Sequence, residues 1–405
     1  MAIETPDVSG VIRRRPGQNK KLVDVTCGLV GVLVLALSGC AGTDTASSAS
    51  TMFYPPPPNP PRIQYLATFS EPNDVKGRNA FTDFLFGDRS RSATIKKPYG
   101  VAEFAGKIYV ADERGAGYAV FDLVAQKFSF VNGEGTGSLR KPINIAVDPA
   151  GNKYITDLGR HQVVAFDKDD NYLRAYEPKG EFKPAGVAVI GDRLYVSDTK
   201  QMQIDVFDVR SGKHLLTFGR RGEKDGEMLH PTNLAAAPNG NLYVTDTNNF
   251  RVQEFTPDGK FVRVLGGVGT GLGRFARPKG LAVDREGRIY VADAAFENVQ
   301  AFNQDGKLLL FFGSPGAKPY NLNLPAALAI NYDDAALFQR FADPMFKVEY
   351  VILVASQFGP NKVNVYGFGR MEGADYPPED VFADESSPGI AAGTNEPAAT
   401  AGGRP

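Results

Sequence analysis

The sequence predicts an all-β fold: six copies of a four-stranded antiparallel sheet that close into a six-bladed β-propeller. Three observations carry this prediction. A Tyr-Val-x-Asp segment or a close variant recurs along the chain, a Phe follows each repeated Asp at a fixed distance, and a Pro opens each copy. Because this spacing leaves no room for variable loops, we expect one repeat architecture rather than the two or three domains that the length of 405 residues suggests.

Three sets of residues define the repeat. The Asp that ends each Tyr-Val-x-Asp-like segment occurs at Asp112, Asp157, Asp198, Asp246 and Asp293. The Phe nine residues later occurs at Phe121, Phe166, Phe207, Phe255 and Phe302. The opening Pro occurs at Pro98, Pro142, Pro184, Pro231, Pro278 and Pro325. The intervals of 42 to 47 residues between these prolines are typical of one propeller blade.

The residues within one copy predict four strands. Apolar side chains alternate with polar or small ones along residues 280–284 and 288–292, as expected for strands that pack on a core. Glycine-containing segments such as residues 284–287 separate the strands and favour hairpin turns, because glycine tolerates a positive φ. One such sheet cannot bury both of its faces, so we expect the six sheets to pack against one another in a closed ring.

The sixth copy departs from the pattern and predicts how the ring closes. After Pro325, residues 332–346 are inserted before the next strand, and Ser356 stands where the other copies carry Asp. No fourth strand follows in this copy. Residues 62–69, at the other end of the core, resemble the fourth strand of the other copies. We therefore expect this N-terminal strand to complete blade six.

Composition argues against several classes of function. Lys plus Arg total 45 against 46 Asp plus Glu, so no overall basic charge indicates nucleic-acid binding. Two cysteines and three histidines predict no disulfide framework and no zinc or haem site. No Ser-His-Asp, Cys-His or phosphate-loop arrangement is recognisable, so we assign no catalytic residue, cofactor or metal ligand. A calcium site made of carboxylates and carbonyls stays open.

The N-terminus carries a targeting signal. Five basic residues at positions 13–21 precede an apolar run, residues 25–37, that is too short to span a membrane. The run ends in Leu-Ser-Gly-Cys40, which resembles the lipobox of bacterial lipoprotein precursors. That resemblance implies cleavage before Cys40, lipid attached to its sulfur, and a place at the bacterial outer membrane, facing the periplasm or the cell surface. The alternatives are a secreted protein cut nearby and a fortuitous apolar segment.

These features divide the chain into four parts. We expect a lipoprotein signal peptide in residues 1–39, the lipidated Cys40 and a Pro-rich tether in residues 40–61, the propeller in residues 62–370, and a disordered tail in residues 371–405. The alternative for the tail is a short docking motif.

The repeat resembles a known family. The Pro, Tyr-Val-x-Asp and Val-x-x-Phe segments are similar to those of the NHL-repeat family of six-bladed propellers, over residues 62–369. Residues 275–280 and 299–302 also resemble a subgroup of bacterial lipoproteins with this repeat. Some members of that subgroup are encoded beside secreted multihaem cytochromes. The resemblance therefore offers an extracellular or periplasmic multihaem cytochrome as a protein partner.

Two repeated positions are candidates for a role in structure or function. We interpret the five repeated Asp side chains as structural acceptors of backbone N–H groups in the adjoining turn, rather than as catalytic groups. The residue before each opening Pro forms a second set, with Leu324 in the sixth copy: Lys97, Lys141, Lys183, His230 and Arg277. Connections between blades share one face, so this set predicts an interrupted basic ring around one mouth of the channel. Further members of the predicted ring are Arg140, Lys279, Asn144 and Asn233.

The basic ring supports the leading functional hypothesis. Converging cations focus an electrostatic field, so the ring is expected to bind an acidic surface, an acidic glycan or haem propionates. The alternative is a set of exposed residues that merely suit the turn before Pro. The sequence thus favours a lipid-anchored, non-enzymatic binding or scaffold propeller of the bacterial envelope. The rivals are a propeller hydrolase or lyase with an axial metal site, and a purely structural element of an envelope complex.

Overall fold

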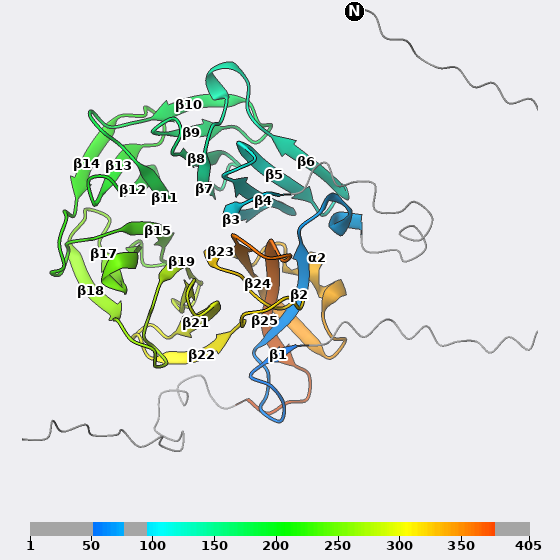
Figure 1. Ribbon diagram of the computed structural model, residues 1–405. Helices are drawn as coiled ribbons and strands as arrows, with labels where there is room; N and C mark the ends of the chain where they lie inside the picture. The colour runs from blue at the N-terminus through cyan, green and yellow to red at the C-terminus, as the bar shows by residue number, and fades with distance from the viewer. Residues whose placement is uncertain (1–51, 77–94, 377–405) are drawn as a thin grey trace, which may run out of the picture. The chain divides into compact units, whose positions relative to one another are not determined.

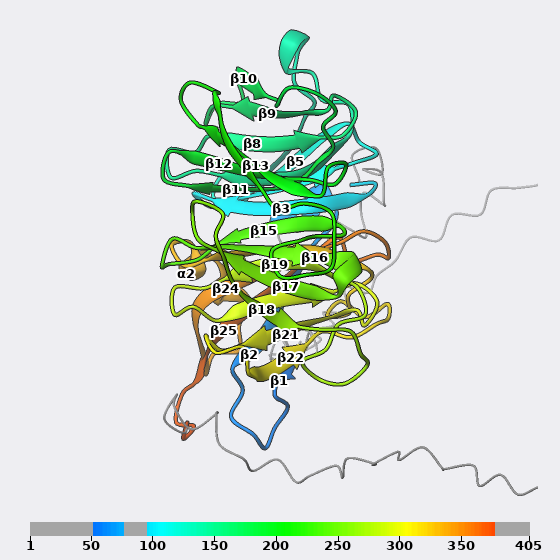
Figure 2. The same cartoon turned by 90° about the vertical axis from the view of Figure 1, so that its left-hand side faces the viewer.

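The computed structural model describes residues 52–76 and 95–376, which form a ring of six sheets. Figure 1 looks along the axis of the ring, with the sheets arranged radially as blades. Figure 2 shows the ring edge-on, with the connections between strands on its two sides. The fold is the six-bladed β-propeller that the repeat spacing predicts. The predicted signal peptide, Cys40 and residues 377–405 of the tail lie outside the described residues.

Five blades follow the predicted order, with four antiparallel strands that run in sequence from the axis outward. Blade 1 contains β3 (Pro98–Phe104), β4 (Lys107–Asp112), β5 (Gly117–Asp122) and β6 (Lys127–Val131). Blade 2 contains β7 (Pro142–Val147), β8 (Lys153–Asp157), β9 (Gln162–Phe166) and β10 (Tyr172–Tyr176). Blade 3 contains β11 (Pro184–Ile190), β12 (Arg193–Asp198), β13 (Gln203–Asp208) and β14 (His214–Phe218). Blade 4 contains β15 (Pro231–Ala236), β16 (Leu242–Asp246), β17 (Arg251–Phe255) and β18 (Phe261–Gly266). Blade 5 contains β19 (Pro278–Val283), β20 (Ile289–Asp293), β21 (Asn298–Phe302) and β22 (Leu308–Phe312).

Blade 6 joins the two ends of the propeller, as the sequence predicts. Its inner strands are β23 (Pro325–Asn331), β24 (Phe346–Ser356) and β25 (Val363–Met371), and the N-terminal β2 (Ile63–Phe69) pairs antiparallel with β25. Ile63 lies opposite Phe368 and Phe69 opposite Val363. A short fifth strand, β1 (Phe53–Tyr54), adds to the outer edge of β2. Ordered structure therefore extends into the segment for which the sequence predicts only a tether.

Short helical segments lie in the connections. The insertion in blade 6 forms α2 (Ala335–Phe338) and the 3-10 turn η5 (Gln339–Phe341), on the left side of Figure 2. The other 3-10 turns are η1 (Pro72–Lys76), η3 (Gly135–Gly137) and η4 (Thr247–Asn249). Phe338 of α2 is fully buried in the core between blades 6 and 1. The insertion is thus packed against the propeller rather than detached from it.

The core consists of hydrophobic clusters between neighbouring blades. The cluster between blades 1 and 2 contains Tyr109 and Tyr118 from one blade with Ile155 and Phe166 from the other. All five repeated Phe side chains are at most 1% exposed. Each sheet therefore buries its faces against its neighbours, which is why an isolated blade would not be stable.

Glycines sit where the hairpins require them. Gly259, between β17 and β18, has a φ of 82°, and Gly287, between β19 and β20, has a φ of 78°. An L-residue rarely adopts this left-handed conformation, so the turn residues inferred from the sequence have a direct structural reason.

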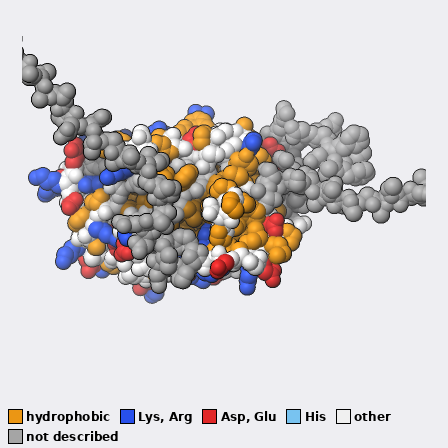
Figure 3. Space-filling model, turned by 90° about the horizontal axis from the view of Figure 1, so that it is seen from below, with side chains coloured by type: hydrophobic (Ala, Val, Ile, Leu, Met, Phe, Trp, Pro, Cys, Tyr) orange, Lys and Arg blue, Asp and Glu red, His pale blue; other side chains and the backbone are white. Residues whose placement is uncertain are grey.

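The part of the outer side that Figure 3 shows carries no dominant charge. Figure 3 views this side from below Figure 1 and shows hydrophobic side chains gathered in one area, with charges of both signs scattered around them. Exposed hydrophobic residues in the described part of the chain include Phe311 on β22 and Met345 before β24.

Candidate functional site: the basic rim

The five residues before the opening prolines lie on one face of the propeller, in the connections that lead into the innermost strands. We call Lys97, Lys141, Lys183, His230 and Arg277 the basic rim. The backbone N–H of each rim residue donates a hydrogen bond to the repeated Asp of its own blade. These N–O distances are 2.8 Å for Lys97, 2.9 Å for Lys141, and 3.1 Å for Lys183, His230 and Arg277.

The repeated Asp side chains also fix the turn that follows them. Asp157 accepts further bonds from the N–H groups of Gly159 (2.8 Å) and Arg160 (3.1 Å). Asp246 instead accepts bonds from the side chains of Asn249 and Arg251. All five carboxylates are at most 1% exposed. They tie two connections together in each blade, and the rim residues therefore stand on a rigid backbone.

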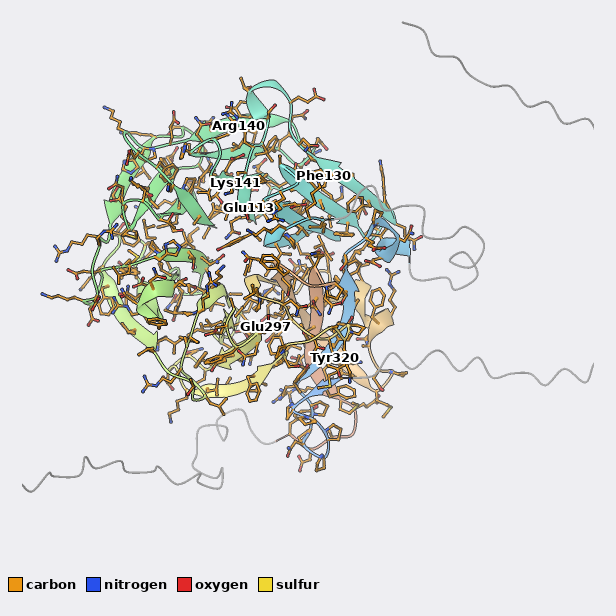
Figure 4. The ribbon with its side chains drawn as sticks, viewed as in Figure 1. Glu113, Phe130, Arg140, Lys141, Glu297 and Tyr320 are labelled. Atoms are coloured by element: carbon orange, nitrogen blue, oxygen red, sulfur yellow. The ribbon has the colours of Figure 1, made fainter. Side chains whose placement is uncertain are left out.

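Two rim lysines form ion pairs with the same carboxylate. Lys97 Nζ lies 2.6 Å and Lys141 Nζ 3.0 Å from the two oxygens of Glu113. Burial would raise the pKa of Glu113, but the hydrogen bonds from both lysines outweigh it and hold the pKa below its usual value. Figure 4 shows Glu113 and Lys141 close together near the centre of the ring, with Arg140 farther out. We call Lys97, Glu113 and Lys141 the compensated arc.

The remaining rim residues form no ion pair with a carboxylate of the described residues. Lys183 and Arg277 are exposed, and neither side chain forms an ion pair within the residues that the structure describes. Arg140 is also exposed. In blades 2 to 5 the residue after the repeated Asp is Leu158, Thr199, Thr247 or Ala294, so none of these blades supplies a counterpart of Glu113. We call Lys183, His230 and Arg277 the open arc.

His230 differs from its lysine and arginine counterparts because it is partly buried. Burial is the largest cause that lowers its pKa. The nearby charges of Lys279 and Arg277 lower the pKa further, and Asp246 opposes them. The imidazole is therefore neutral at neutral pH and contributes a hydrogen-bonding group rather than a charge to the open arc.

Lys279 lies beneath the rim rather than on it, which corrects its predicted place. Its side chain is 7% exposed, and Nζ lies 5.0 Å from the centre of the Tyr99 ring. Burial, followed by the charges of Arg277 and Lys97, lowers the pKa of Lys279 to about 8. Sequence position alone places this residue beside Arg277, but its ammonium group lies over the ring of Tyr99, which belongs to blade 1.

Asn144 and Asn233 are also buried. Contrary to the prediction, they therefore do not add polar contacts to the ring around the mouth of the channel. Asn144 Nδ2 donates to Asn233 Oδ1 (2.7 Å), and Asn233 Nδ2 donates to the carbonyl oxygen of Ala326 (3.1 Å). This chain of bonds links blades 2, 4 and 6 across the axis. At the same repeat position, blades 1, 3 and 5 carry glycine; a Cβ at Gly100 would lie 2.6 Å from the Asn144 Cα. The alternation allows close approach at the axis.

A small cavity lies on the other side of the Asn pair. Its volume is about 240 Å³, and its walls are the innermost strands, from the two Asn residues to their far ends. Glu103 lines its mouth, and the N–H of Gly106 donates both to Glu103 Oε1 (3.1 Å) and to Asp334 Oδ2 (2.9 Å). Burial and the neighbouring Asp334 carboxylate raise the pKa of Glu103 to about 9. Sequence reasoning missed this carboxyl pair because Asp334 belongs to the insertion.

The three histidines lie apart, and two of them have structural contacts of their own. His161 Nδ1 lies 2.9 Å from the carbonyl oxygen of Phe182, and His214 Nε2 lies 3.0 Å from Asp205 Oδ1. No group of three or more His, Cys, Asp or Glu side chains in residues 52–76 and 95–376 is arranged to hold a metal ion. The same residues contain no helix long and apolar enough to cross a membrane.

Comparison with known proteins agrees with this architecture. A family model described as the NHL repeat matches residues 228–255 and 275–300, which lie in blades 4 and 5. The chain is therefore a six-bladed β-propeller that carries NHL repeats, as the sequence predicts. Its predicted place in a lipoprotein subgroup of this family stays a prediction.

Curated relatives match only part of their own length. The protein SUPPRESSOR OF QUENCHING 1, chloroplastic, of Arabidopsis thaliana is 27% identical over 236 residues, which are 47% of this chain and 22% of that protein. The protein brain tumor of Drosophila melanogaster is 34% identical over 89 residues, 21% of this chain and 8% of that protein. The matches thus cover less than a quarter of these relatives.

Solved structures show the same fold at low identity. A protein of unknown function from Bacteroides thetaiotaomicron is 19% identical with a TM-score of 0.51, over 69% of this chain and 71% of that one. A gluconolactonase from Xanthomonas campestris is 15% identical with a TM-score of 0.50, over 76% of this chain and 89% of that one. At these identities the similarity concerns the fold alone.

Proposed function

We propose that this protein is a lipid-anchored, non-enzymatic binding propeller of the bacterial envelope, whose basic rim binds an acidic surface on a secreted protein partner. The observation that carries the proposal is the open arc. Its two exposed cations, Lys183 and Arg277, have no anionic partner in the described part of the chain, and buried carboxylates hold their backbone in place.

The physical argument concerns the balance of charge on this face. Exposed cations that converge on a rigid frame create a positive potential, which attracts an anionic surface and orients it. Such a field favours association and specificity, whereas one exposed ion pair contributes little affinity. A rigid scaffold with variable connections is suited to this kind of recognition.

The anchor and the partner class rest on the sequence. The lipobox-like segment that ends at Cys40 supports attachment to the outer membrane. The resemblance to lipoproteins encoded beside secreted cytochromes supports a multihaem cytochrome as the partner, because its haem propionates provide the required carboxylates. The anchor is tested by metabolic labelling with a tritiated fatty acid: the wild-type chain is expected to incorporate label and Cys40→Ala to lose it.

The partner proposal is tested by chemical crosslinking in intact envelopes, followed by pull-down. We expect a defined partner to be captured in a salt-sensitive manner. A variant with Lys141, Lys183 and Arg277 replaced by Glu should lose this capture. A matched variant with Lys127, Lys213 and Lys260 replaced by Glu carries the same charge change in the turns of the opposite face and should keep it. Equal capture by both variants would refute the proposal.

The enzymatic alternative has less support. The described residues supply no group of metal ligands at the axis, so we derive no catalytic step through a metal there. The similarity to a gluconolactonase concerns the fold alone. Turnover of a lactone by the purified protein, lost on chelation, would favour the alternative.

A further inference from the structure

Two polar side chains meet beneath the rim and a third lies near them, and we call the three the axial cluster. They are Tyr99 of blade 1, His230 before blade 4 and Lys279 of blade 5. Lys279 Nζ faces the Tyr99 ring at 5.0 Å, and His230 lies close enough to Lys279 for its pKa to be lowered. Within the described residues, no hydrogen bond or ion pair is formed by the Lys279 ammonium, the Tyr99 hydroxyl or the His230 imidazole.

An unpaired ammonium in this position is unusual. Lysine is almost never buried without a partner, because desolvation of the charged form is costly. Here the side chain of Lys279 is more than nine-tenths buried, and two further cations, Arg277 and Lys97, add repulsion. A negatively charged group beside Nζ would relieve both penalties at once. The cluster therefore has the electrostatics of an anion site.

The surroundings define how an anion would reach the site. On one side, the bonds from Asn144 to Asn233 and from Asn233 to Ala326 close the axis. The cavity beyond this Asn pair is not lined by Tyr99 or Lys279. An anion would therefore have to reach the axial cluster from the rim face, which is the face of the open arc.

The donors at the site suit a monoanion with two oxygens. Lys279 Nζ and the Tyr99 hydroxyl are two donors, which suits the two oxygens of one carboxylate. After burial, the charges of Arg277 and Lys97 lower the pKa of Lys279, and the opposing effect of Glu113 is smaller, so the local field suits an anion. Phosphate has four oxygens, for which two donors are too few.

We infer that Tyr99, His230 and Lys279 form a binding site for a single carboxylate, which the partner inserts at the axis of the propeller while the open arc contacts its surface. This inference rests on the proposed function for the identity of the carrier, but the site itself can be tested with small molecules. Lys279 forms the ion pair, Tyr99 donates the second hydrogen bond, and His230 adds a neutral polar wall.

The test is isothermal titration calorimetry on the propeller-containing chain with small probes. N-acetylglycine represents a chain-terminal carboxylate and N-acetylglutamate amide a side-chain carboxylate, while N-acetylglycinamide is the neutral control and inorganic phosphate the competing anion. We expect saturable binding of the carboxylates, with a Kd on the order of 1 mM for probes of this size. The difference between the two carboxylates identifies which source the site prefers.

Variants assign the binding to the axial cluster. Lys279→Met is expected to weaken carboxylate binding at least about tenfold, and Tyr99→Phe about threefold, as loss of an ion pair and of one hydrogen bond predicts. Lys213→Met, in a turn of the opposite face, is the matched control and should bind as the wild type does. At pH 9 the wild type should take up a proton on binding, because the bound carboxylate favours the charged form of Lys279; Lys279→Met should not.

Several results would overturn the inference. These are equal binding of the neutral amide, tighter binding of phosphate than of either carboxylate, or unchanged binding by Lys279→Met with a native melting profile. The proposed function is separable from this result. If Lys279→Met still captures the envelope partner and charge reversal at the rim abolishes capture, the proposed function stands and the axial site falls. If the chain binds carboxylates but captures no envelope partner, the axial site stands and the proposed function falls.

Discussion

The two ends of the propeller axis carry opposite chemistry, although the same six strands form both. Toward the rim, the ammonium of Lys279 is buried beside Tyr99. Toward the opposite face, Glu103 and Asp334 share the N–H of Gly106. Burial favours the neutral form at each end, so the pKa of Lys279 falls to about 8 and that of Glu103 rises to about 9. The Asn144–Asn233 hydrogen bond separates them.

The difference shows which positions of a repeat protein give each end of the axis its own charged group. At the position directly after the opening Pro, only blade 5 carries a charged residue, Lys279; the others carry Tyr99, Ile143, Ala185, Thr232 and Ala326. Five residues after the Pro, only blade 1 carries one, Glu103; the others carry Val147, Val189, Ala236, Val283 and Ile330. The charged group at each end of the axis thus comes from one residue that departs from the repeat.

Closure of the ring by β2 is a precondition for both ends, and its removal should have the largest effect. Deletion of residues 62–69 leaves β25 without its partner strand and exposes the core between blades 6 and 1. We expect this deletion to abolish the cooperative thermal unfolding transition, measured by circular dichroism. An unchanged transition would contradict the role of β2 in closing the propeller.

Loss of one repeated Asp should damage the rim end selectively. Asp293 accepts hydrogen bonds from the N–H groups of Ala276 (2.7 Å) and Ala295 (2.9 Å), besides that of Arg277. Asp293→Ala leaves these groups without an acceptor and should lower the free energy of unfolding by roughly 3 kcal/mol. Urea denaturation measures the change, and Asp305→Ala in an exposed turn is the control. A loss no larger than that of the control would contradict this structural role.

The acidic end should give a negative slope of stability against pH. The folded protein binds a proton at Glu103 that the unfolded chain releases above about pH 4.5, and it holds this proton up to about pH 9. Stability is therefore expected to fall as pH rises through this window. Glu103→Gln should flatten the slope, because the variant has no carboxyl group to titrate. The expected stabilisation at pH 8 is roughly 2 kcal/mol, a figure reduced for the screening of this partly exposed group by water. Chemical denaturation from pH 4 to 9 measures the slope for both proteins. The same slope of stability against pH in the variant and the wild type would contradict the prediction.

The basic end should give a slope of opposite sign at higher pH. Between about pH 8 and 10.5 the unfolded chain binds a proton at Lys279 that the folded protein has released, so stability should rise with pH. Lys279→Met removes this rise and, at pH 7, removes the cost of a buried charge, for a gain of roughly 1 to 2 kcal/mol. Denaturation at pH 7 and pH 10 measures both. A destabilised variant at pH 7 would mean that the contact of the ammonium with the Tyr99 ring outweighs the cost of its burial.

The sequence predicted what the repeat imposes on every blade. The spacing of Asp157 and Phe166 recurs because each blade needs the same turn and the same core contact, so periodicity alone located the strands, the repeated Asp set and the rim. The closing strand was predicted from the absence of a fourth strand after Tyr366. These features depend on contacts within one blade or between neighbours.

The features that the sequence did not predict join residues distant in the chain. Asn144 and Asn233 are 89 positions apart and meet only because opposite blades converge at the axis. Asp334 reaches Gly106 across 228 positions. One signal was present: glycine alternates with larger residues two positions after the opening prolines, at Gly100, Asn144, Gly186, Asn233, Gly280 and Ala327. That alternation indicates close packing across the axis.

The most direct measurement compares partner capture by two variants of the rim as a function of salt. One variant replaces Lys183 and Arg277 of the open arc by Gln, and the other replaces Lys97, Glu113 and Lys141 of the compensated arc by Gln. We predict that the first loses about tenfold in capture at low salt and most of its salt dependence, while the second changes by no more than about threefold. Equal losses in both variants, or full capture by the first, would contradict the account.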